Sequence, residues 1–184
     1  MIIVFIGPPF AGKGTQVSLL GKKLGLPVFS MGAIIREEYK AGNPKAIEGF
    51  EKYSMKGFHL PIELKFDLLK ERLEKAPNGF ILDHFPATQE DLDAFNKYLD
   101  SKGFHTDRAF YLFVSEDEMK KRIITRERAD DNPEIIMKRR EIQDKDRIPV
   151  VTYFRDKGIL EEVDGGRSVK EVHRDILNRL GVNN

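Results

Sequence analysis

The sequence has no cysteine and no tryptophan, and it lacks an apolar run long enough to cross a bilayer. Without cysteine the chain can form neither disulfides nor Cys-ligated zinc sites, which favours a cytoplasmic protein. Its longest apolar run is residues 1–6, whereas a membrane-spanning helix needs about 20 such residues. Because no basic segment precedes this run and no small-residue cleavage site follows it, we expect a strand there and not a signal peptide.

The chain also lacks an excess of charge of one sign, since 31 basic and 30 acidic side chains leave a formal net charge of +1. The two signs are mixed along the chain, so no basic stripe is present to bind duplex nucleic acid. We expect individual arginines to bind small anionic ligands, with no nucleic-acid or membrane partner. The 184 residues, 40% of them hydrophobic, suffice for one globular domain, which we expect to be a monomer.

What the sequence does have is an alternation of strand-like and helical segments. Short runs rich in branched or aromatic residues recur at 2–6, 27–29, 80–82, 110–114 and, more weakly, 159–163. Each is followed by a helical pattern, which predicts an α/β fold with a five-stranded parallel sheet flanked by helices. Capping boxes are expected at Ser115 with Glu118 and at Ser168 with Glu171, and Thr88 is a further candidate N-cap.

Two stretches interrupt this alternation. About fifty residues between the second and third strand-like runs show no strand pattern and are divided by Gly42-Asn43-Pro44 and by turn residues at 57–61, which predicts a small helical insertion. A second stretch, 122–147, is dense in alternating charge. We expect breaks in it at residues 130–133 and after it at Pro149.

A glycine-rich loop between the first strand and the next helix is the strongest functional signal. It reads Gly7-Pro8-Pro9-Phe10-Ala11-Gly12-Lys13-Gly14-Thr15. Glycines let the backbone form a nest of N–H groups around phosphate oxygens, and the helix N-terminus adds its positive end. Lys13 can reach the β and γ oxygens of a nucleoside triphosphate, so the loop predicts a P-loop. The general pattern has a hydroxyl residue directly after the lysine, whereas here it comes one residue later, at Thr15.

This loop resembles that of adenylate kinase and related nucleoside monophosphate kinases, in which Gly-Lys-Gly-Thr is usual and glycine stands at the position of Phe10. Residues 30–36, SMGAIIR, resemble the family's Ser-Thr-Gly-Asp-x-x-Arg. Residues 78–86, NGFILDHFP, resemble its Asn-Gly-Phe-x-x-Asp-Gly-Phe-Pro, which an arginine follows in the family. The resemblance implies a P-loop NTPase fold with a core at 1–29, 61–121 and 134–184, an acceptor-binding insertion at 30–60 and a short lid at 122–133.

The resemblance further implies that ATP and AMP react to give two ADP, with Mg²⁺ and by direct phosphoryl transfer. The implied catalytic residues are Lys13, Arg36, Asp83, Arg126, Arg128 and Arg139. ATP would bind the loop from Gly7 to Thr15 together with Arg122, Arg126 and Arg167. The implied acceptor-binding residues are Ser30, Met31, Gly32, Arg36, Phe58, His59, Leu60, His84, Phe85 and Ala87. Thr15 and Asp83 would hold Mg²⁺ through water.

Charge accounts for several of these implied roles. Arg36 would hold the acceptor phosphate through paired hydrogen bonds, which suit a guanidinium. Asp83 ends a buried strand, where a carboxylate is costly unless it serves a ligand. Arg128 and Arg139 are eleven residues apart, as are two family arginines that converge on the transferred group, and the transition state spreads negative charge over that group. Arg122 would stack on the ATP base.

Some positions depart from the family pattern and leave alternatives open. Ala87 stands where the family has a second arginine for the acceptor phosphate, and loss of such a contact costs about tenfold to a hundredfold in acceptor binding or rate. His84 replaces a glycine, and Met31 and Ala33 replace polar residues of the acceptor pocket. One alternative is a kinase of the same fold that acts on UMP, CMP or another monophosphate. The other is a nucleotide-binding module that has lost transfer activity.

Overall fold

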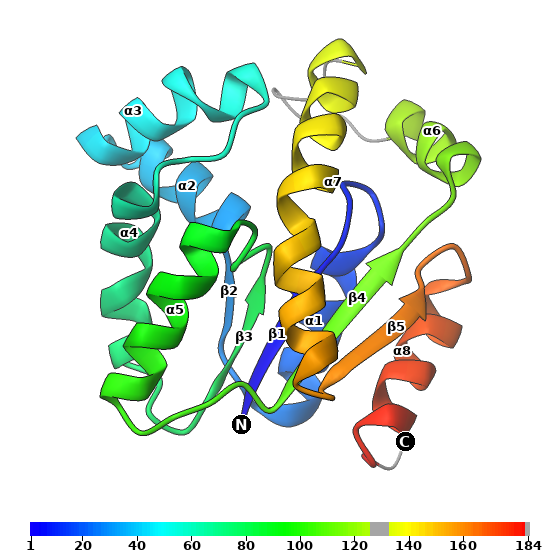
Figure 1. Ribbon diagram of the computed structural model, residues 1–184. Coiled ribbons are helices and arrows are strands. Elements are labelled where there is room, and N and C mark those ends of the chain that lie inside the picture. Colours follow the sequence, from blue (N-terminus) through cyan, green and yellow to red (C-terminus); the bar gives the residue numbers. More distant parts are fainter. Residues whose placement is uncertain (126–132, 183–184) are drawn as a thin grey trace.

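The computed structural model describes residues 1–125 and 133–182 (Figure 1). Strands and helices alternate along the chain, as the sequence predicts. The strands are β1 (Ile2–Ile6), β2 (Val28–Ser30), β3 (Phe80–Asp83), β4 (Arg108–Phe113) and β5 (Leu160–Asp164). The helices are α1 (Lys13–Leu24), α2 (Met31–Lys40), α3 (Pro44–Lys52), the 3₁₀ turn η1 (Ser54–Lys56), α4 (Ile62–Glu74), α5 (Gln89–Ser101), α6 (Glu116–Thr125), α7 (Pro133–Asp156) and α8 (Val169–Arg179).

The strands pair in the order β2-β3-β1-β4-β5, and every neighbouring pair is parallel. This confirms the predicted five-stranded parallel sheet. In the register, Phe5 of β1 and Ser30 of β2 both lie beside Asp83 of β3. Because the strands run the same way, their carboxyl ends and the loops after them gather at one edge, which is where parallel α/β sheets bind ligands.

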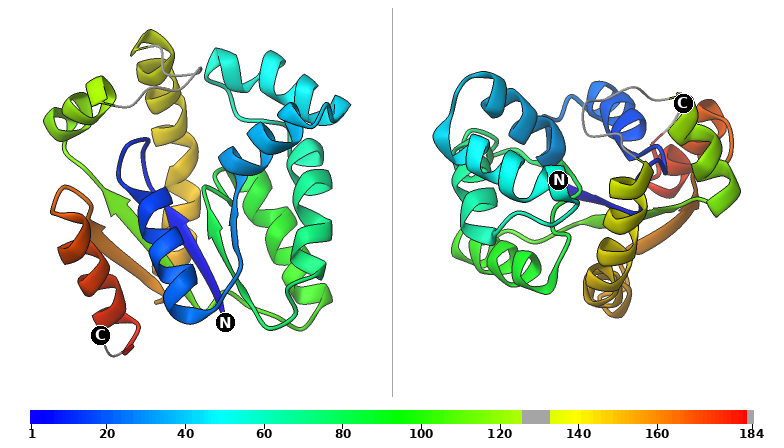
Figure 2. Two further views of the ribbon diagram at one scale, coloured as in Figure 1. Left: turned by 180° about the vertical axis from the view of Figure 1, so that it is seen from behind. Right: turned by 90° about the horizontal axis from the view of Figure 1, so that it is seen from above.

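Side chains of β1 alternate between two cores, one on each face of the sheet. Ile2, Val4 and Ile6 pack with residues of α4, α5 and α7, whereas Ile3 and Phe5 pack with residues of α1 and α8. Figures 1 and 2 show these two groups of helices covering opposite faces. The apolar run at the start of the sequence therefore reflects a strand that is buried on both sides. Within residues 1–125 and 133–182, no helix combines the length and the apolarity of a membrane span.

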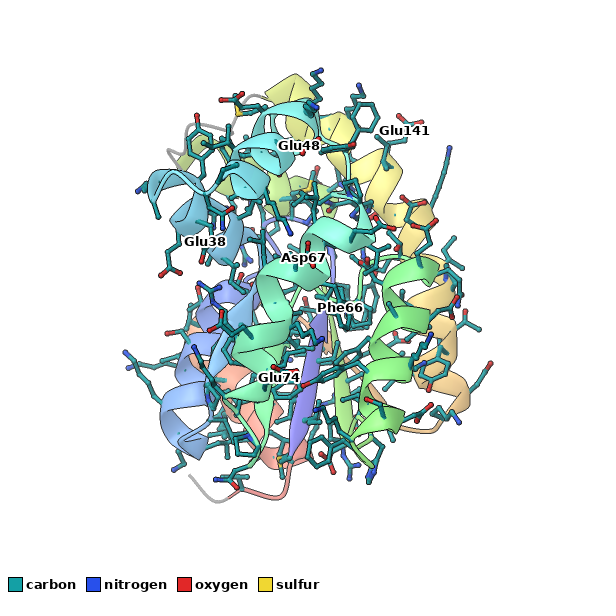
Figure 3. The ribbon with its side chains drawn as sticks, turned by 90° about the vertical axis from the view of Figure 1, so that its left-hand side faces the viewer. Glu38, Glu48, Phe66, Asp67, Glu74 and Glu141 are labelled. Atoms are coloured by element: carbon teal, nitrogen blue, oxygen red, sulfur yellow. The ribbon has the colours of Figure 1, made fainter. Side chains whose placement is uncertain are left out.

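The predicted helical insertion forms α2, α3 and η1, and hydrogen bonds to one carboxylate join it to α4. Glu38 of α2 accepts from Arg72 of α4 at 2.8 Å and from Asn43 at 2.9 Å. These two donors, Asn43 first, lower the pKa of the Glu38 carboxyl. Asn43 also caps α3, accepting from Lys45 N. On the far side of α4, the Phe66 ring points toward α5 and lies 5.8 Å from the Tyr98 ring (Figure 3).

All three expected N-caps form, but only one of the two expected capping boxes is complete. Ser168 and Glu171 make both hydrogen bonds of a capping box, and the Thr88 hydroxyl accepts from Asp91 N. At Ser115 the hydroxyl accepts from Glu118 N at 3.2 Å, but the Glu118 carboxylate accepts from Arg122 instead of returning to the cap. The N-terminus of α6 is thus tied to Arg122, which lines the candidate site.

The break expected at Pro149 is wrong, because α7 continues through this residue to Asp156. An internal proline removes one helical hydrogen bond and costs about 3 kcal/mol. Val150 and Phe154, directly beyond the proline, are both fully buried against the sheet. Burial of two such side chains contributes a comparable or larger stabilisation, so tertiary packing keeps the second half of α7 helical.

Candidate functional site

A cleft of about 1470 Å³ opens at the carboxyl edge of the sheet. Its walls come from the glycine-rich loop, the first turns of α1 and α2, the end of β3, and the loop between β5 and α8. In Figure 1 this edge lies at the top of the sheet, between the insertion (α2 and α3) and α6. Residues distant in sequence therefore meet around one space that is large enough for two nucleotides.

The glycine-rich loop is shaped by glycines at its two ends. Gly7 has φ +148°, and a Cβ there would lie 2.1 Å from the Leu112 carbonyl oxygen of β4. Gly12, with φ +88°, is the left-handed N-cap of α1. Lys13 is 9% exposed, and its Nζ donates to the carbonyls of Gly7 and Pro8, both at 2.8 Å. The loop thus curls around its own ammonium group, ahead of a helix N-terminus, which is the geometry of a phosphate cradle.

Phe10 adopts a backbone conformation that glycine, which the family pattern has at this position, would take without strain. Its φ is +64°, in the left-handed region, which costs about 1–2 kcal/mol for a residue with a Cβ. Its side chain is only 9% exposed and packs in the core cluster on the α1 face of the sheet. The strain is therefore offset by burial of an aromatic ring, and the ring does not fill the cradle.

Exchanging Phe10 for glycine should accordingly destabilise the protein. Loss of a buried phenylalanine costs about 3–5 kcal/mol, whereas relief of the strained φ returns about 1–2 kcal/mol, so we expect a net loss of roughly 2 kcal/mol. Urea denaturation measures it. Phe10→Ala is the matched control, because it loses the ring but keeps the strain and should be less stable than Phe10→Gly by about 1 kcal/mol. Equal stability of the two variants would refute the strain argument.

Arg122 and the loop after β5 lie directly against the glycine-rich loop. Arg122 donates to the carbonyls of Phe10 and Gly165, each at 2.9 Å, and to the Glu118 carboxylate at 3.0 Å. A Cβ on Gly165 would lie 2.3 Å from the Ala11 carbonyl oxygen, so the two loops touch. Arg167 lines the same part of the cleft and pairs with Asp175 at 2.5 Å. Of the two predicted ATP residues, Arg122 therefore contacts the loop, and Arg167 lines the cleft that the loop borders.

Asp83 lies between the two ends of the cleft and has one carboxylate oxygen without a partner. It is 7% exposed, and Ser30 Oγ donates to its Oδ2 at 2.8 Å. Its Oδ1 is buried and accepts no hydrogen bond from the described residues. Thr15 is exposed in the same cleft. A buried anionic oxygen without a donor requires water or a cation, and oxygen ligands of this kind suit water-coordinated Mg²⁺.

The predicted acceptor residues of the insertion line the other end of the cleft. Met31 is buried at the start of α2, and a Cβ on Gly32 would lie 3.3 Å from Arg36 Nη1, so the glycine leaves room for the guanidinium. Arg36, His59 and Leu60 all contribute to this wall. Phe58 also lines it, is 43% exposed, and carries Lys138 of α7 over its ring at 4.4 Å.

His59 and His84 form a stacked pair in this wall, with ring centroids 6.1 Å apart and planes inclined by 20°. Burial, followed by the nearby charge of Lys65, lowers the pKa of His59 to about 4. The pKa of His84 is also lowered well below its usual value, by burial first and then by Lys13. Like Phe10, His84 has a left-handed backbone, with φ +62°. Both imidazoles are therefore neutral near pH 7.

The lowered pKa of His59 predicts acid destabilisation. Unfolded histidine titrates near 6.5 and the folded group at about 4. The unfolded state therefore binds more protons between these values, and stability is lost as the pH falls through this window. The expected loss is about 2 kcal/mol by pH 5. The variant His59→Phe keeps an aromatic ring against His84 but cannot bind this proton, so its free energy of unfolding should fall less between pH 7 and pH 5. Urea denaturation at the two pH values measures this, and an equal fall in wild type and variant would contradict it.

Two predicted acceptor residues, Ala87 and Phe85, have different surroundings. Ala87 lines the cleft, and its N–H donates to Asp91 Oδ2 at 2.9 Å. Phe85 differs from the expectation, because it is fully buried in the core, against Phe66 and Phe95, and does not line the cleft. Its ring supports the turn after β3 from below, so the side chain serves packing.

Sequence reasoning missed a buried ion pair beneath the acceptor end of the cleft. Lys65 of α4 donates to both oxygens of Asp91 at 2.8 Å, and the two residues are 4% and 1% exposed. Lys65 also lines the cleft. One signal was available: Lys65 precedes the buried Leu68 and Leu69 by three and four residues, so it lies on the apolar face of its helix.

The structure describes little of the remaining predicted catalytic arginines. Arg126 and Arg128 lie outside the described residues. Arg139 lies on α7, and only its backbone is described. The role expected of these three residues thus stays a prediction.

Comparisons with known proteins agree with this geometry. The sequence model of the adenylate kinase family matches residues 5–159. An adenylate kinase of Mycolicibacterium paratuberculosis is 37% identical over 183 residues, covering 98% of this chain and 99% of the relative. Adenylate kinase 1 of a Nostoc species is 35% identical over 181 residues, covering 97% and 98%. An adenylate kinase of Clostridium tetani is 31% identical over 217 aligned positions, covering both chains completely.

Proposed function

This chain belongs to the adenylate kinase family, and we propose that it transfers the terminal phosphoryl group of ATP to AMP, giving two ADP, with Mg²⁺. One observation carries the proposal: the P-loop with Lys13 and the acceptor wall with Arg36 line the same cleft, with Asp83 between them. A donor and an acceptor bound at the two ends would face each other across the edge of the sheet. All these groups come from one chain, and we propose that it acts as a cytoplasmic monomer.

Each residue has a task that its surroundings support. The P-loop N–H groups and Lys13 would bind the donor's β and γ oxygens, and Lys13 would exchange the Gly7 and Pro8 carbonyls for phosphate. Arg122 and Arg167 would contact the base and phosphates of ATP beside the loop. Arg36 would hold the acceptor phosphate in line with the donor. No covalent intermediate is required, since the enzyme supplies position and charge.

Thr15 and Asp83 would hold Mg²⁺, Asp83 through the unpartnered Oδ1 and bound water. When bound, the ion neutralises charge on the β and γ oxygens of ATP. Ser30 fixes the other carboxylate oxygen, so the orientation of Asp83 is set before any ligand binds.

We further propose that the insertion at 30–60 and the lid at 122–133 close over bound nucleotides and exclude water, which protects ATP from hydrolysis. Residues of the insertion already contact α7, where Lys138 lies over Phe58 and Asp146 lies 3.5 Å from His59. Closure would bring arginines of the lid and of α7 toward the transferred group.

A coupled assay of ADP formation from ATP and AMP tests the function. We expect Mg²⁺-dependent turnover with AMP, and lower kcat/KM with UMP, CMP and GMP. A higher kcat/KM with another monophosphate would identify that nucleotide, and not AMP, as the acceptor. Tight ATP binding without transfer to any monophosphate would instead indicate a binding module.

Replacing Arg128 or Arg139 by alanine should slow single-turnover transfer about tenfold to a hundredfold, because each removes a charge-assisted contact to the transition state. The matched control is Arg155→Ala, which removes an exposed arginine of α7 that pairs with Glu162. Rapid-quench measurement at saturating ATP and AMP separates the chemical step from binding. Wild-type rates in both variants would remove them from the mechanism.

A further inference from the structure

A narrow gap, without room for a water molecule in this structure, adjoins the acceptor end of the cleft. His59, His84, Ala87 and Gln143 line both the gap and the cleft, so these four residues form the partition between them. Arg147 of α7 lines the gap from the far side. Only short side chains and two neutral rings thus separate this arginine from the acceptor end.

Arg147 is buried and incompletely hydrogen-bonded. It is 6% exposed, and its Nη1 donates to Asp144 Oδ1 at 2.6 Å. Its Nη2 is buried and has no hydrogen-bond partner among the described residues. Gln143 Oε1, on the partition, is likewise without a partner there. A buried guanidinium N–H without an acceptor is costly, so the arrangement favours an anion or water as the acceptor where the described residues offer none.

The direction of α7 places this guanidinium toward the cleft. Side chains of a helix lean toward its N-terminus. The N-terminus of α7 lies at the carboxyl edge of the sheet, beyond the P-loop (Figure 1). Arg147 donates to Asp144, three residues nearer that N-terminus, so its guanidinium is held toward this end of the helix.

Cations and carboxylates from several elements surround the partition. His84 experiences the charges of Lys13, Arg147 and Lys65 together. Asp91 accepts from Lys65 and from Ala87 N, and Asp83 accepts from Ser30. Lys65 and Arg147 are thus each paired with one carboxylate, and Arg147 still has its buried Nη2 without an acceptor among the described residues.

We propose that Arg147 binds the phosphate of the acceptor nucleotide past the small side chain of Ala87, with a movement of the partition that lets the two groups meet. The family pattern has an arginine at position 87, which would reach this space from the turn after β3. Here Ala87 has only a methyl group, and Arg147 of α7 lines the same narrow gap. The inference rests on the proposed function, because it takes a nucleoside monophosphate as the acceptor.

The test measures steady-state KM for AMP and for ATP, together with AMP binding by calorimetry. Arg147→Met should raise the KM and Kd for AMP about tenfold to a hundredfold and leave the KM for ATP within about twofold. The KM and Kd for AMP of Arg147→Lys should lie between those of wild type and of Arg147→Met, since lysine keeps the charge but loses the second donor. Arg155→Met, on an exposed face of the same helix, should match wild type.

A second variant separates binding from folding. Adding Ala87→Arg to Arg147→Met should recover most of the lost AMP affinity, because the guanidinium returns to the same space from the other side. Equal rises in both KM values, a lowered melting temperature and no recovery would show Arg147 to be a packing residue and overturn the inference.

Failure of the two proposals would look different. Unchanged AMP affinity in Arg147→Met, with an active wild type, overturns the role of Arg147 alone. A wild type that binds AMP without transferring phosphate overturns the proposed function, and the Kd comparison still decides the role of Arg147. A wild type that binds no AMP overturns both.

Discussion

Replacing Lys13 by methionine is expected to lower kcat/KM for ATP and AMP by about two to three orders of magnitude. Methionine keeps most of the aliphatic length, so the change removes mainly the ammonium group. That group is held over the loop by the Gly7 and Pro8 carbonyls, at 2.8 Å from each. Removal of one preorganised donor from a site of developing charge typically costs about a hundredfold to a thousandfold in rate.

The matched control for this experiment is Lys23→Met, in the last turn of the same helix, where the side chain is exposed and outside the cleft. It should retain wild-type turnover. Thermal denaturation of both variants checks that the loop still folds, since Gly7 and Gly12 set its path independently of the lysine side chain. Undiminished turnover in Lys13→Met would remove the central element of the proposed mechanism.

The sequence predicted the fold well because its signals are local. The run at 2–6 is apolar at every position, and burial of β1 on both faces accounts for this. The glycines at 7 and 12 have the positive φ angles that the P-loop pattern requires. Neither the apolar run nor the glycine pattern predicts the strand order. In the structure β3 lies between β1 and β2, and this order depends on pairing between residues that are distant in the sequence.

The parts of the site that sequence reasoning missed depend on residues brought together by the fold. Lys65 and Asp91 are 26 positions apart and pair across two helices. Arg147 belongs to a stretch of mixed charge, and nothing in that pattern distinguishes a buried arginine from an exposed one. The break expected at Pro149 failed for the same reason, because the packing of Val150 and Phe154 is set by the sheet beneath them.

Changing Lys65 to methionine is expected to be the most destabilising of the substitutions considered. It would leave the Asp91 carboxylate, 1% exposed, without its ammonium partner. Breaking a buried ion pair from one side costs about 3–5 kcal/mol. For a chain of this length that corresponds to a fall of about 6–20 °C in melting temperature. Lys70→Met, on the exposed side of the same helix, should change stability by less than about 0.5 kcal/mol.

Removing the charge from both partners should restore much of this loss. Asp91→Asn keeps a carbonyl oxygen that can still accept from Ala87 N, so the double variant Lys65→Met with Asp91→Asn leaves neither a buried charge nor that amide unpaired. Urea denaturation of the two single variants and the double variant forms a cycle that isolates the coupling between the partners. If an unpaired carboxylate is the cause, Lys65→Met should be less stable than the double variant. Additive losses, with the double variant the least stable, would contradict this cause.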